Sequence, residues 1–410
     1  MTDICRRSLL LGATAVSGLA APRAQAQPTP IRLGVLTDLS SAYADSSGPG
    51  SVLATRMAVA DFMATSPGFP VEIVVADMQN KPDVASSIAR AWFDRDGVDA
   101  VLDMPQSAVA LAIASMVREK DKVALFSAPG TSELTGAACT PNQVHWTYDT
   151  YALAKSVTQI MVGQGGKRWF FVSADYSFGK SLEQDAAAFI SQAGGDVVGS
   201  VRYPFPQTSD FSSYLLQAQA SGAQVIGLAM SGSDAVNCVK QAAEFGIVQG
   251  GQKIAGLALL ITTIHAIGLE MAQGLILSVP FYWNLNDGTR AFGRRFAAER
   301  GGAMPTMNHA GAYASTLHYL KAVKAIGPAA ATASGRAAIL QMKATPTDDP
   351  LFGHGTIRAD GRVIHDMHVF QVKSPAESKE PWDYYTLLRT IPGDQAFRPM
   401  AGGKCTLTPA

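Results

Sequence analysis

The stretch IRLGVLT at residues 31–37 has the length and apolar character of a buried β-strand, and it opens an alternating series. Residues 52–63 follow it with apolar side chains three and four positions apart, the spacing of a helix with one buried face. A second β-type run, VEIVVA, begins at residue 71. A strand, a helix and a strand in this order predict a parallel sheet built from βαβ units. We therefore predict an α/β protein.

The alternation continues along the chain and then begins a second time. The first series predicts strands at residues 31–37, 71–76, 100–103, 123–127 and 144–148, with helices at 52–63, 82–94 (with Asn80 as its N-cap) and 107–119. The second series predicts strands at 169–173, 197–203, 225–230 and 254–259, with helices at 179–192, 211–220 and 234–245. Two such series predict two α/β lobes.

The last third of the chain departs from strict alternation. After a strand at residues 275–279, three helices at 289–300, 310–325 and 336–343 have no full strand between them, so we expect them to cover the first lobe. A β-type run at 367–372 is expected to rejoin the second lobe. No long Pro/Ser-rich or charged spacer separates the parts, which favours a hinge over a free linker. We predict that lobe 1 comprises residues 27–147 and 280–352, that lobe 2 comprises 148–279 and 353–393, and that a tail of residues 394–410 packs back on lobe 1.

The N-terminus has the pattern of a cleaved export signal. Arg6 and Arg7 precede an apolar run from Leu9 to Ala21, and a small-residue site ends at Ala26. The apolar run is too short for a membrane anchor, which needs about 20 residues. The paired arginines leave both the twin-arginine and the Sec export routes open. We predict that residues 1–26 are removed and that the protein works in the periplasm.

The composition limits the partners. The chain has 410 residues, ample for two domains, and its 33 basic side chains equal its 33 acidic ones. A balanced charge provides no long-range field to gather phosphate backbones or anionic lipid, so we expect neither nucleic acid nor a membrane surface as partner. We expect a monomer.

An exported protein can form disulfides, and three cysteines follow the signal. Cys238 lies in a helical pattern and is interpreted as a small buried hydrophobe. Cys139 and Cys405 both lie in loop-like surroundings rich in Gly, Pro and Thr. We therefore favour a Cys139–Cys405 disulfide.

Motifs for catalysis, cofactors or metals are not convincing. The run GGK at residues 165–167 has Met161 where a P-loop needs its first Gly and Arg168 where it needs Ser or Thr. In a β-type run His365 and His368 point to opposite faces and cannot grip one metal ion. The sequence contains neither a G-x-S-x-G elbow nor a G-x-G-x-x-G fingerprint. We predict no enzyme activity, no cofactor and no metal site.

In open parallel sheets, ligands bind beyond the carboxyl ends of the strands. Here most loops after the predicted strands carry Gly, Ser, Thr, Tyr or Asp, which offer hydroxyls or backbone N–H groups near helix starts. Such groups suit a carboxylate.

Several stretches resemble periplasmic solute-binding proteins of the leucine/isoleucine/valine and amide class that serve ABC transporters. They are LGVLTDLS at 33–40 with residues 48–61, SAPGTSELT at 127–135, DYSFG at 175–179 and DFS at 210–212. The likeness extends over nearly the whole mature chain, and its order is more specific than any one motif. It implies two Rossmann-like lobes with parallel central sheets, three hinge crossings, and closure around one small ligand that an ABC permease of the inner membrane then receives.

The resemblance also implies roles for individual residues. Ser107 and Thr131 would donate hydroxyls to a ligand carboxylate, and the backbone of Pro129 and Gly130 would complete that clamp. Asp149 matches an acidic position near a ligand amine. Together with neighbouring aromatic and loop positions, the predicted ligand-binding residues are Tyr43, Ser107, Pro129, Gly130, Thr131, Asp149, Tyr151, Phe178, Asp234 and Leu260.

One departure from the family bears on the ligand. Residues 256–261 are wholly apolar, where amino-acid binders of the class usually place a Glu that pairs with the ligand's ammonium group. Burying an ammonium without a partner costs several kcal/mol. Aromatic side chains in or near the predicted loops suit a flat apolar body instead; they are Tyr43, Tyr151, Tyr176, Phe178, Tyr282 and Trp283.

We predict a binding protein for a carboxylate-bearing ligand with an apolar or aromatic body. A branched-chain amino acid remains the alternative if Asp149 or Asp234 supplies the missing charge. A ligand-sensing domain acting on a receptor, in place of a transporter, and a hydrolase on the same scaffold are the other hypotheses.

Overall fold

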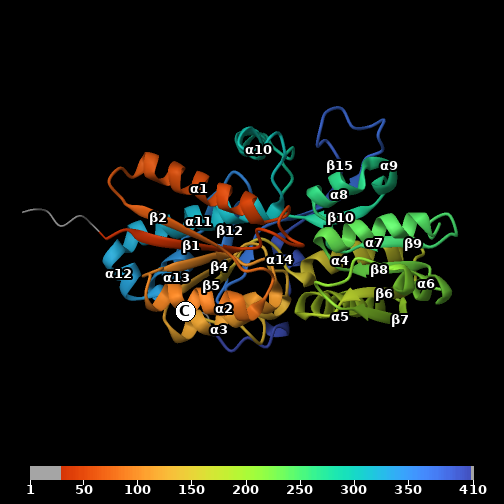
Figure 1. Cartoon of the computed structure of the whole chain (residues 1–410), viewed down its shortest axis with the longest axis horizontal. Helices are drawn as coiled ribbons and strands as arrows, with labels where there is room; N and C mark the ends of the chain where they lie inside the picture. The colour runs from red at the N-terminus through yellow and green to blue at the C-terminus, as the bar shows by residue number, and fades with distance from the viewer. Residues whose placement is uncertain (1–28, 408–410) are drawn as a thin grey trace, which may run out of the picture.

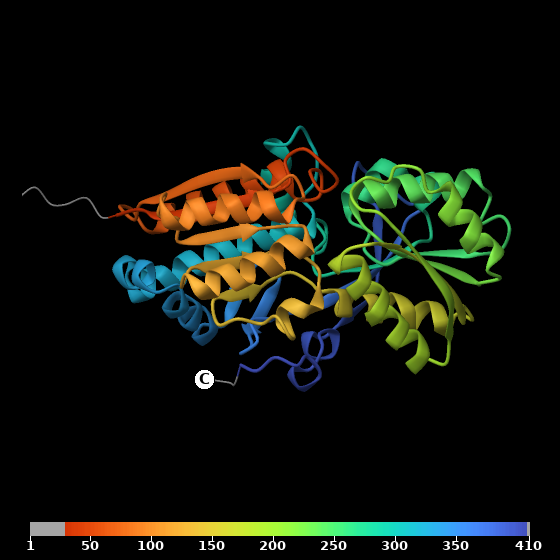
Figure 2. The same cartoon turned by 60° about the horizontal axis from the view of Figure 1, so that its bottom comes forward.

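The computed structural model describes residues 29–407, and the predicted signal at 1–26 lies outside them. Its elements form two α/β lobes that lie side by side (Figure 2). Each lobe has its own parallel sheet, which confirms the predicted fold class.

The sheet of lobe 1 has five parallel strands in the order β2-β1-β3-β4-β5. They are β1 (Ile31–Thr37), β2 (Val71–Asp77), β3 (Ala100–Asp103), β4 (Val123–Phe126) and β5 (Gln143–His145). Strands β3 and β4 are buried at every position, because helices cover both faces of the sheet. Close packing also explains Gly34 in β1, where a Cβ atom would lie 2.5 Å from the ring of Trp92.

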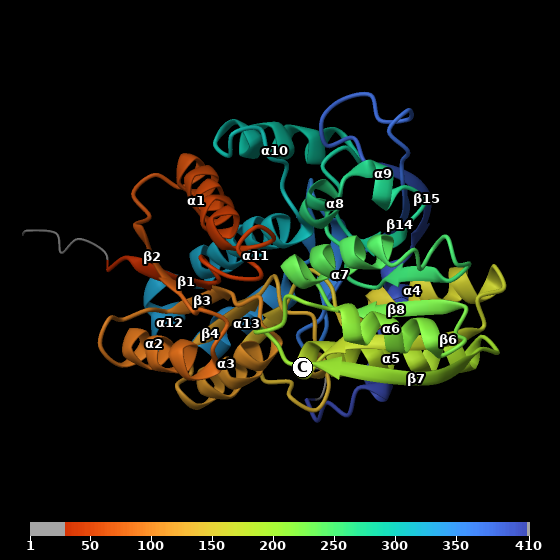
Figure 3. The ribbon, with the colours of Figure 1, turned by 45° about the vertical axis from the view of Figure 1, so that its right-hand side comes forward.

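Two groups of helices cover this sheet (Figure 3). Helices α2 (Pro82–Asp94) and α3 (Ser107–Glu119) pack together, and the apolar face of α2 includes Ala85, Ala89 and Trp92 at helical spacing. The other group is α1 (Gly48–Thr65), α11 (Met307–Ile326), α12 (Pro328–Ala333) and α13 (Gly335–Ala344), with α10 (Asp287–Ala298) against α1 and α11. The helices expected to return to lobe 1 therefore do so.

Lobe 2 has a four-stranded parallel sheet in the order β7-β6-β8-β9. Its strands are β6 (Arg168–Ala174), β7 (Asp196–Tyr203), β8 (Val225–Ala229) and β9 (Lys253–Gly256). Its helices are α4 (Thr150–Gly163), α5 (Ser177–Gln192), α6 (Ser212–Ala220), α7 (Gly232–Glu244), α8 (Ile261–Ile267) and α9 (Leu269–Ala272). An antiparallel sheet of β10 (Ile276–Val279), β14 (Met367–Val372) and β15 (Tyr385–Ile391) completes the lobe (Figure 1).

Several elements differ from the predictions, and three of the differences lie near strand or helix ends or at the sheet edge. The strand expected at 254–259 ends at Gly256, and residues 257–260 form a buried loop. The N-cap of α2 is Lys81 and not Asn80. The backbone of Asn80 has a φ of 52°, and the side chain of Asn80 donates to Asp38 at 2.6 Å. Strand β15 was not predicted, because most of its side chains are exposed and its pattern is correspondingly weak.

The chain crosses between the lobes after β5, after β10 and before β14. The third crossing lies later than the predicted boundary at residue 353. Strand β12 (Gly353–Ile357) pairs with β11 (Thr347–Asp349) and β13 (Val363–Ile364), and Arg362 forms a β-bridge with His145, the last residue of β5. Residues 353–364 therefore lie with lobe 1, because their backbone pairs there.

The tail after β15 touches both lobes. Helix α14 (Gly393–Ala396) packs on α4, and the single turn η2 (Met400–Gly402) follows it. Cys405 then forms a disulfide with Cys139, whose sulfur atoms are 2.03 Å apart. Cys238 is free and buried. The predicted pairing is confirmed.

Candidate ligand site between the lobes

The carboxyl ends of the two parallel sheets face each other across a narrow cavity. Its volume is about 10 Å³, room for about one water molecule. Both lobes contribute to its wall, so the lobes are closed upon it. The lining residues are Tyr43, Ser46, Pro105, Ala128, Tyr148, Tyr176, Phe178, Ser231, Leu260 and Asn308.

Aromatic rings form one side of the cavity. Tyr176 stacks on Phe205 with ring centroids 4.5 Å apart, and Tyr43 of lobe 1 stacks on the same Phe205 at 5.6 Å. The hydroxyls of Tyr43 and Tyr176 also bond to each other across the lobes. Phe178 lies 6.0 Å from Tyr176 by ring centroids. Such a wall suits a flat or apolar ligand body.

The loop that carries Tyr43 is held in place by Asp38. This buried carboxylate accepts hydrogen bonds from the backbone N–H groups of Ser41 and Tyr43. In the same loop, the backbone carbonyl of Ala42 accepts a hydrogen bond of 3.2 Å from the backbone N–H of Ser233 in lobe 2. The same loop therefore lines the cavity and joins the lobes.

No residue that lines the cavity carries a charge. A buried carboxyl, Asp103, stands at the end of β3, where it accepts hydrogen bonds from Thr37 at 2.6 Å and Ser127 at 2.9 Å. Burial raises the pKa of Asp103 to about 6 in spite of these bonds. Its backbone has a φ of 79°, in the left-handed region that a non-glycine residue rarely adopts.

The residues predicted to clamp a carboxylate lie close together, and they stand beside the cavity lining. The hydroxyl of Ser107, in the first turn of α3, accepts a hydrogen bond of 3.3 Å from the backbone N–H of Thr131, and both residues are fully buried. The carbonyl of Pro129 bonds to His145 at 2.7 Å. Gly130 touches the cavity wall, because a Cβ atom there would lie 2.6 Å from the ring of Phe178.

Three other predicted residues stand away from the cavity lining. Asp149 is the N-cap of α4 and accepts from the backbone N–H of Ala152 at 2.8 Å. Tyr151 packs edge-on against Phe189. Asp234 accepts a hydrogen bond from Tyr203 at 2.8 Å, and burial raises its pKa to about 6. The structure thus brings Tyr43, Phe178 and Leu260 together in the cavity wall.

The remaining cavity residues were missed for different reasons. Tyr176 belongs to the aromatic side chains near the predicted loops, and Ser46, Pro105, Ala128, Tyr148 and Ser231 lie in or beside loops that follow strands. Asn308 comes from α11, which follows no strand, so the rule about carboxyl ends does not point to it.

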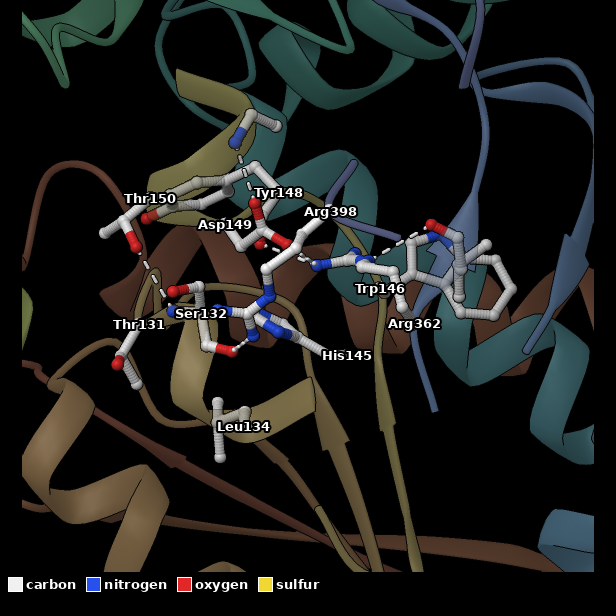
Figure 4. Close-up of polar contacts among 12 residues, drawn as sticks. Thr131, Ser132, Leu134, His145, Trp146, Tyr148, Asp149, Thr150, Arg362 and Arg398 are labelled. Atoms are coloured by element: carbon white, nitrogen blue, oxygen red, sulfur yellow. Dashed lines mark hydrogen bonds and ion pairs between the residues drawn. The ribbon is translucent and has the colours of Figure 1, made fainter. Parts of the chain in front are cut away.

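Figure 4 shows a second polar centre, at the hinge. Arg362 is fully buried and donates to the carbonyl of Tyr148 at 2.8 Å, while its guanidinium lies 3.8 Å from the carboxylate of Asp149. It also covers the ring of Phe397 in the tail, 4.6 Å from the centroid. Burial lowers the pKa of Arg362 to about 10. We call Arg362, Tyr148, Asp149 and Phe397 the hinge core.

A third polar cluster links the lobes beside the hinge. Asp185 of α5 accepts hydrogen bonds from Thr150 at 2.6 Å and from Ser132 of lobe 1 at 3.1 Å. Burial raises the pKa of Asp185 to about 6. Arg398 of the tail donates to the carbonyl of Ser132 at 2.7 Å (Figure 4).

The described residues contain no cluster of three or more potential metal ligands. His365 donates or accepts a hydrogen bond with the carbonyl of Trp146 at 3.0 Å, and His368 bonds to Thr390 at 2.9 Å, so the two rings have separate partners. Within residues 29–407 no helix has the length and apolar character needed to span a bilayer.

Two α/β lobes that close on an aromatic cavity define a ligand-binding protein of the two-lobed hinged class. The periplasmic binding protein family has a sequence model that matches residues 30–379. The chain belongs to the periplasmic binding protein family, which confirms the resemblance found in its motifs.

Related proteins agree with this assignment. The chain is similar to a periplasmic binding protein from Burkholderia mallei whose crystal structure has a TM-score of 0.88, at 46% identity and covering 92% of this chain and 99% of that one. It is also similar to a branched chain amino acid ABC transporter periplasmic ligand-binding protein from Burkholderia xenovorans LB400, with a TM-score of 0.79, 42% identity and coverage of 92% and 99%. A Leu/Ile/Val-binding protein homolog 4 of Brucella abortus is 24% identical over 347 residues, covering 81% of this chain and 82% of the relative.

Proposed function

We propose that this protein is the extracytoplasmic solute-binding component of an ABC importer and that it binds a small carboxylate-bearing ligand with an apolar or aromatic body between its lobes. The observation that carries the proposal is the cavity itself, which is lined from both lobes by aromatic rings and hydroxyls and by no charged side chain. The importer is supported by the relative from Burkholderia xenovorans, whose description names an ABC transporter. The ligand leaves the site chemically unchanged.

The uncharged wall supports an organic acid over an α-amino acid. A buried ammonium needs a carboxylate or several acceptors, because an unpaired buried charge costs several kcal/mol. Asp149 and Asp234 do not line the cavity, and each already accepts a hydrogen bond from the protein. A buried ligand carboxylate needs no charged partner, because hydroxyl and backbone N–H donors of the kind found near Ser107 and Thr131 can hydrogen-bond to it.

The alternative is a branched-chain amino acid, as in the description of the relative from Burkholderia xenovorans. This ligand requires Asp149 or Asp234, neither of which lines the cavity in this structure, to turn toward the ligand's ammonium group. A ligand-sensing role on a receptor uses the same cavity and differs in the partner.

We also propose that residues 1–26 export the chain to the periplasm by the twin-arginine or the Sec route. Mass spectrometry of the protein recovered from the periplasm should give an N-terminus near Gln27. A chain that keeps its first 26 residues, or that is found in the cytoplasm, would contradict this proposal.

The function is tested by thermal unfolding of the purified protein in the presence of amino acids, aliphatic acids and aromatic acids. A ligand that binds only the folded protein raises the melting temperature; at 100 times its Kd it adds about 2.7 kcal/mol to the free energy of unfolding. We expect aromatic or branched aliphatic acids to give the largest shifts. A complete set of acids and amino acids that shifts nothing would refute the proposal.

The partner and the absence of chemistry need separate tests. Deletion of neighbouring permease genes should abolish uptake of the bound acid, and a neighbouring receptor gene in their place would support the sensing role. Recovery of the bound compound unchanged after long incubation is expected, and turnover would favour a hydrolase.

A further inference from the structure

One polar atom of the residues that line the cavity has no hydrogen-bond partner within residues 29–407. Asn308 lies in the first turn of α11 and is only 3% exposed. Its Nδ2 donates to the hydroxyl of Ser47 at 3.2 Å, whereas its Oδ1 is buried and makes no hydrogen bond. Leaving a buried acceptor unpaired destabilises the folded protein, so this atom calls for an explanation.

The surroundings hold Asn308 in position. Thr306, two residues before Asn308, donates to the carbonyl of Ser46 at 2.8 Å, and the following residue, His309, bonds to the carbonyl of Ser47 at 2.9 Å. The first turn of α11 is thus fixed to the loop that carries Tyr43. The amide of Asn308 cannot readily swing away to find another partner.

The other polar side chains of the cavity are already engaged. Ser46 donates to the carbonyl of Tyr43 at 3.2 Å, Tyr148 to that of Ala128 at 2.7 Å, and Ser231 to that of Ala258 at 2.8 Å. The hydroxyls of Tyr43 and Tyr176 bond to each other. Each of these hydroxyls has at least one hydrogen-bond partner, whereas Asn308 Oδ1 is, among the described residues that line the cavity, the buried side-chain atom that has none.

We propose that Asn308 is a specificity-determining residue and that it selects ligands carrying a hydroxyl or another O–H or N–H donor on the body of the molecule, apart from the carboxylate. This inference rests on the proposed function and narrows its ligand class to hydroxylated acids over plain hydrocarbon acids. A hydroxyl fits the site well, because it donates to Oδ1 and would equally accept from Nδ2 if the amide were turned around. A site built around a ligand hydroxyl rejects the analogue without it, since the protein's own polar atom then stays unpaired.

The test uses pairs of acids that differ by one hydroxyl. Affinities of the full mature chain are measured by calorimetry for 4-hydroxybenzoate against benzoate and for 2-hydroxy-4-methylpentanoate against 4-methylpentanoate. We expect at least one hydroxylated acid to bind ten- to a hundredfold more tightly than its partner, the range that one unpaired buried acceptor implies. The variant N308L, which has a similar shape and no polar atom, should remove that difference.

Two further variants keep the test decisive. N237L makes the same exchange on α7, outside the cavity lining, and should retain the discrimination. N308S is measured alongside in case N308L does not fold. Equal affinities within every pair, or discrimination that survives in both N308L and N308S, would overturn the inference and leave the proposed function standing. Failure of a complete set of small acids and amino acids to bind the wild type would refute the proposed function and this inference together.

Discussion

The ligand cavity and the hinge core lie on either side of Tyr148 and use opposite chemistry. The cavity is lined by uncharged side chains, while the hinge core contains a fully buried guanidinium with a carboxylate 3.8 Å away. Tyr148 takes part in both, because its ring lines the cavity and its carbonyl accepts from Arg362. The charge in this part of the protein is thus used to hold chain crossings together, and ligand recognition is left to neutral donors and aromatic rings.

The largest expected effect comes from removing the hinge charge. R362M leaves Asp149 buried without its cation, and breaking a buried pair in this way costs about 3–5 kcal/mol. Denaturant unfolding measures the loss. R202M is the matched control, since Arg202 is half-exposed and its single contact with Glu183 should contribute less than about 1 kcal/mol. If both variants lose equally little, the hinge core does not depend on its charge.

The next effect concerns the tail that carries Phe397 to the hinge core. Replacing both cysteines (C139S/C405S) removes the covalent hold on the tail and should lower the free energy of unfolding by about 2–4 kcal/mol. Urea unfolding of wild type with and without reductant checks this value. Equal stability of the reduced and oxidised wild type would show that hydrogen bonds and packing alone secure the tail.

The carboxyl behind the cavity gives a pH-dependent effect. The pKa of Asp103 is raised to about 6 in the folded protein, so the folded state holds this proton more tightly than the unfolded chain does. The stability that protonation provides is fully present below the unfolded pKa near 4 and is lost as the pH rises through 6. Between pH 7 and pH 4, wild type should therefore gain up to about 3 kcal/mol relative to D103N. Unfolding curves of the two proteins that stay parallel across this range would contradict the burial of an ionisable Asp103.

The smallest effect is expected at the contact between the two tyrosine hydroxyls. Y43F removes that contact and should weaken ligand affinity three- to tenfold, with a change of at most about 1 kcal/mol in the free energy of unfolding. Calorimetry with the acid that binds wild type best measures the affinity. Y214F, on α6 and outside the cavity lining, is the control and should change neither quantity. A greater loss of stability than of affinity in Y43F would assign this tyrosine to folding.

The sequence predicted the two-lobed α/β fold because each buried parallel strand, such as β4, is a continuous apolar run between helices of clear periodicity. The antiparallel strand β15 was not predicted, because its mostly exposed side chains do not form a continuous apolar run. The third crossing was placed too early because a short sheet pairing, here β12 with β11 and β13, depends on contacts made only in the folded chain.

The cavity was predicted in part for the same physical reasons. Tyr43 and Phe178 lie near strand ends, where the topology of parallel sheets concentrates ligand contacts. Asp149 was expected to face a ligand amine, but its partners are the first turn of α4 and Arg362, a residue more than two hundred positions away. Asn308 was not predicted to line the cavity, because α11 reaches the cavity through its packing against α1 and the loop after β1.

The covalent attachment of the tail has a practical consequence for measuring motion. The chain leaves lobe 2 at β15, yet Cys405 is bonded to Cys139 in lobe 1. A fluorophore attached at Lys404 therefore moves with the first lobe, although the nearest preceding strand belongs to the second. A distance sensor built on this protein needs its other dye on an exposed site of lobe 2, such as Leu216, to register the hinge at all.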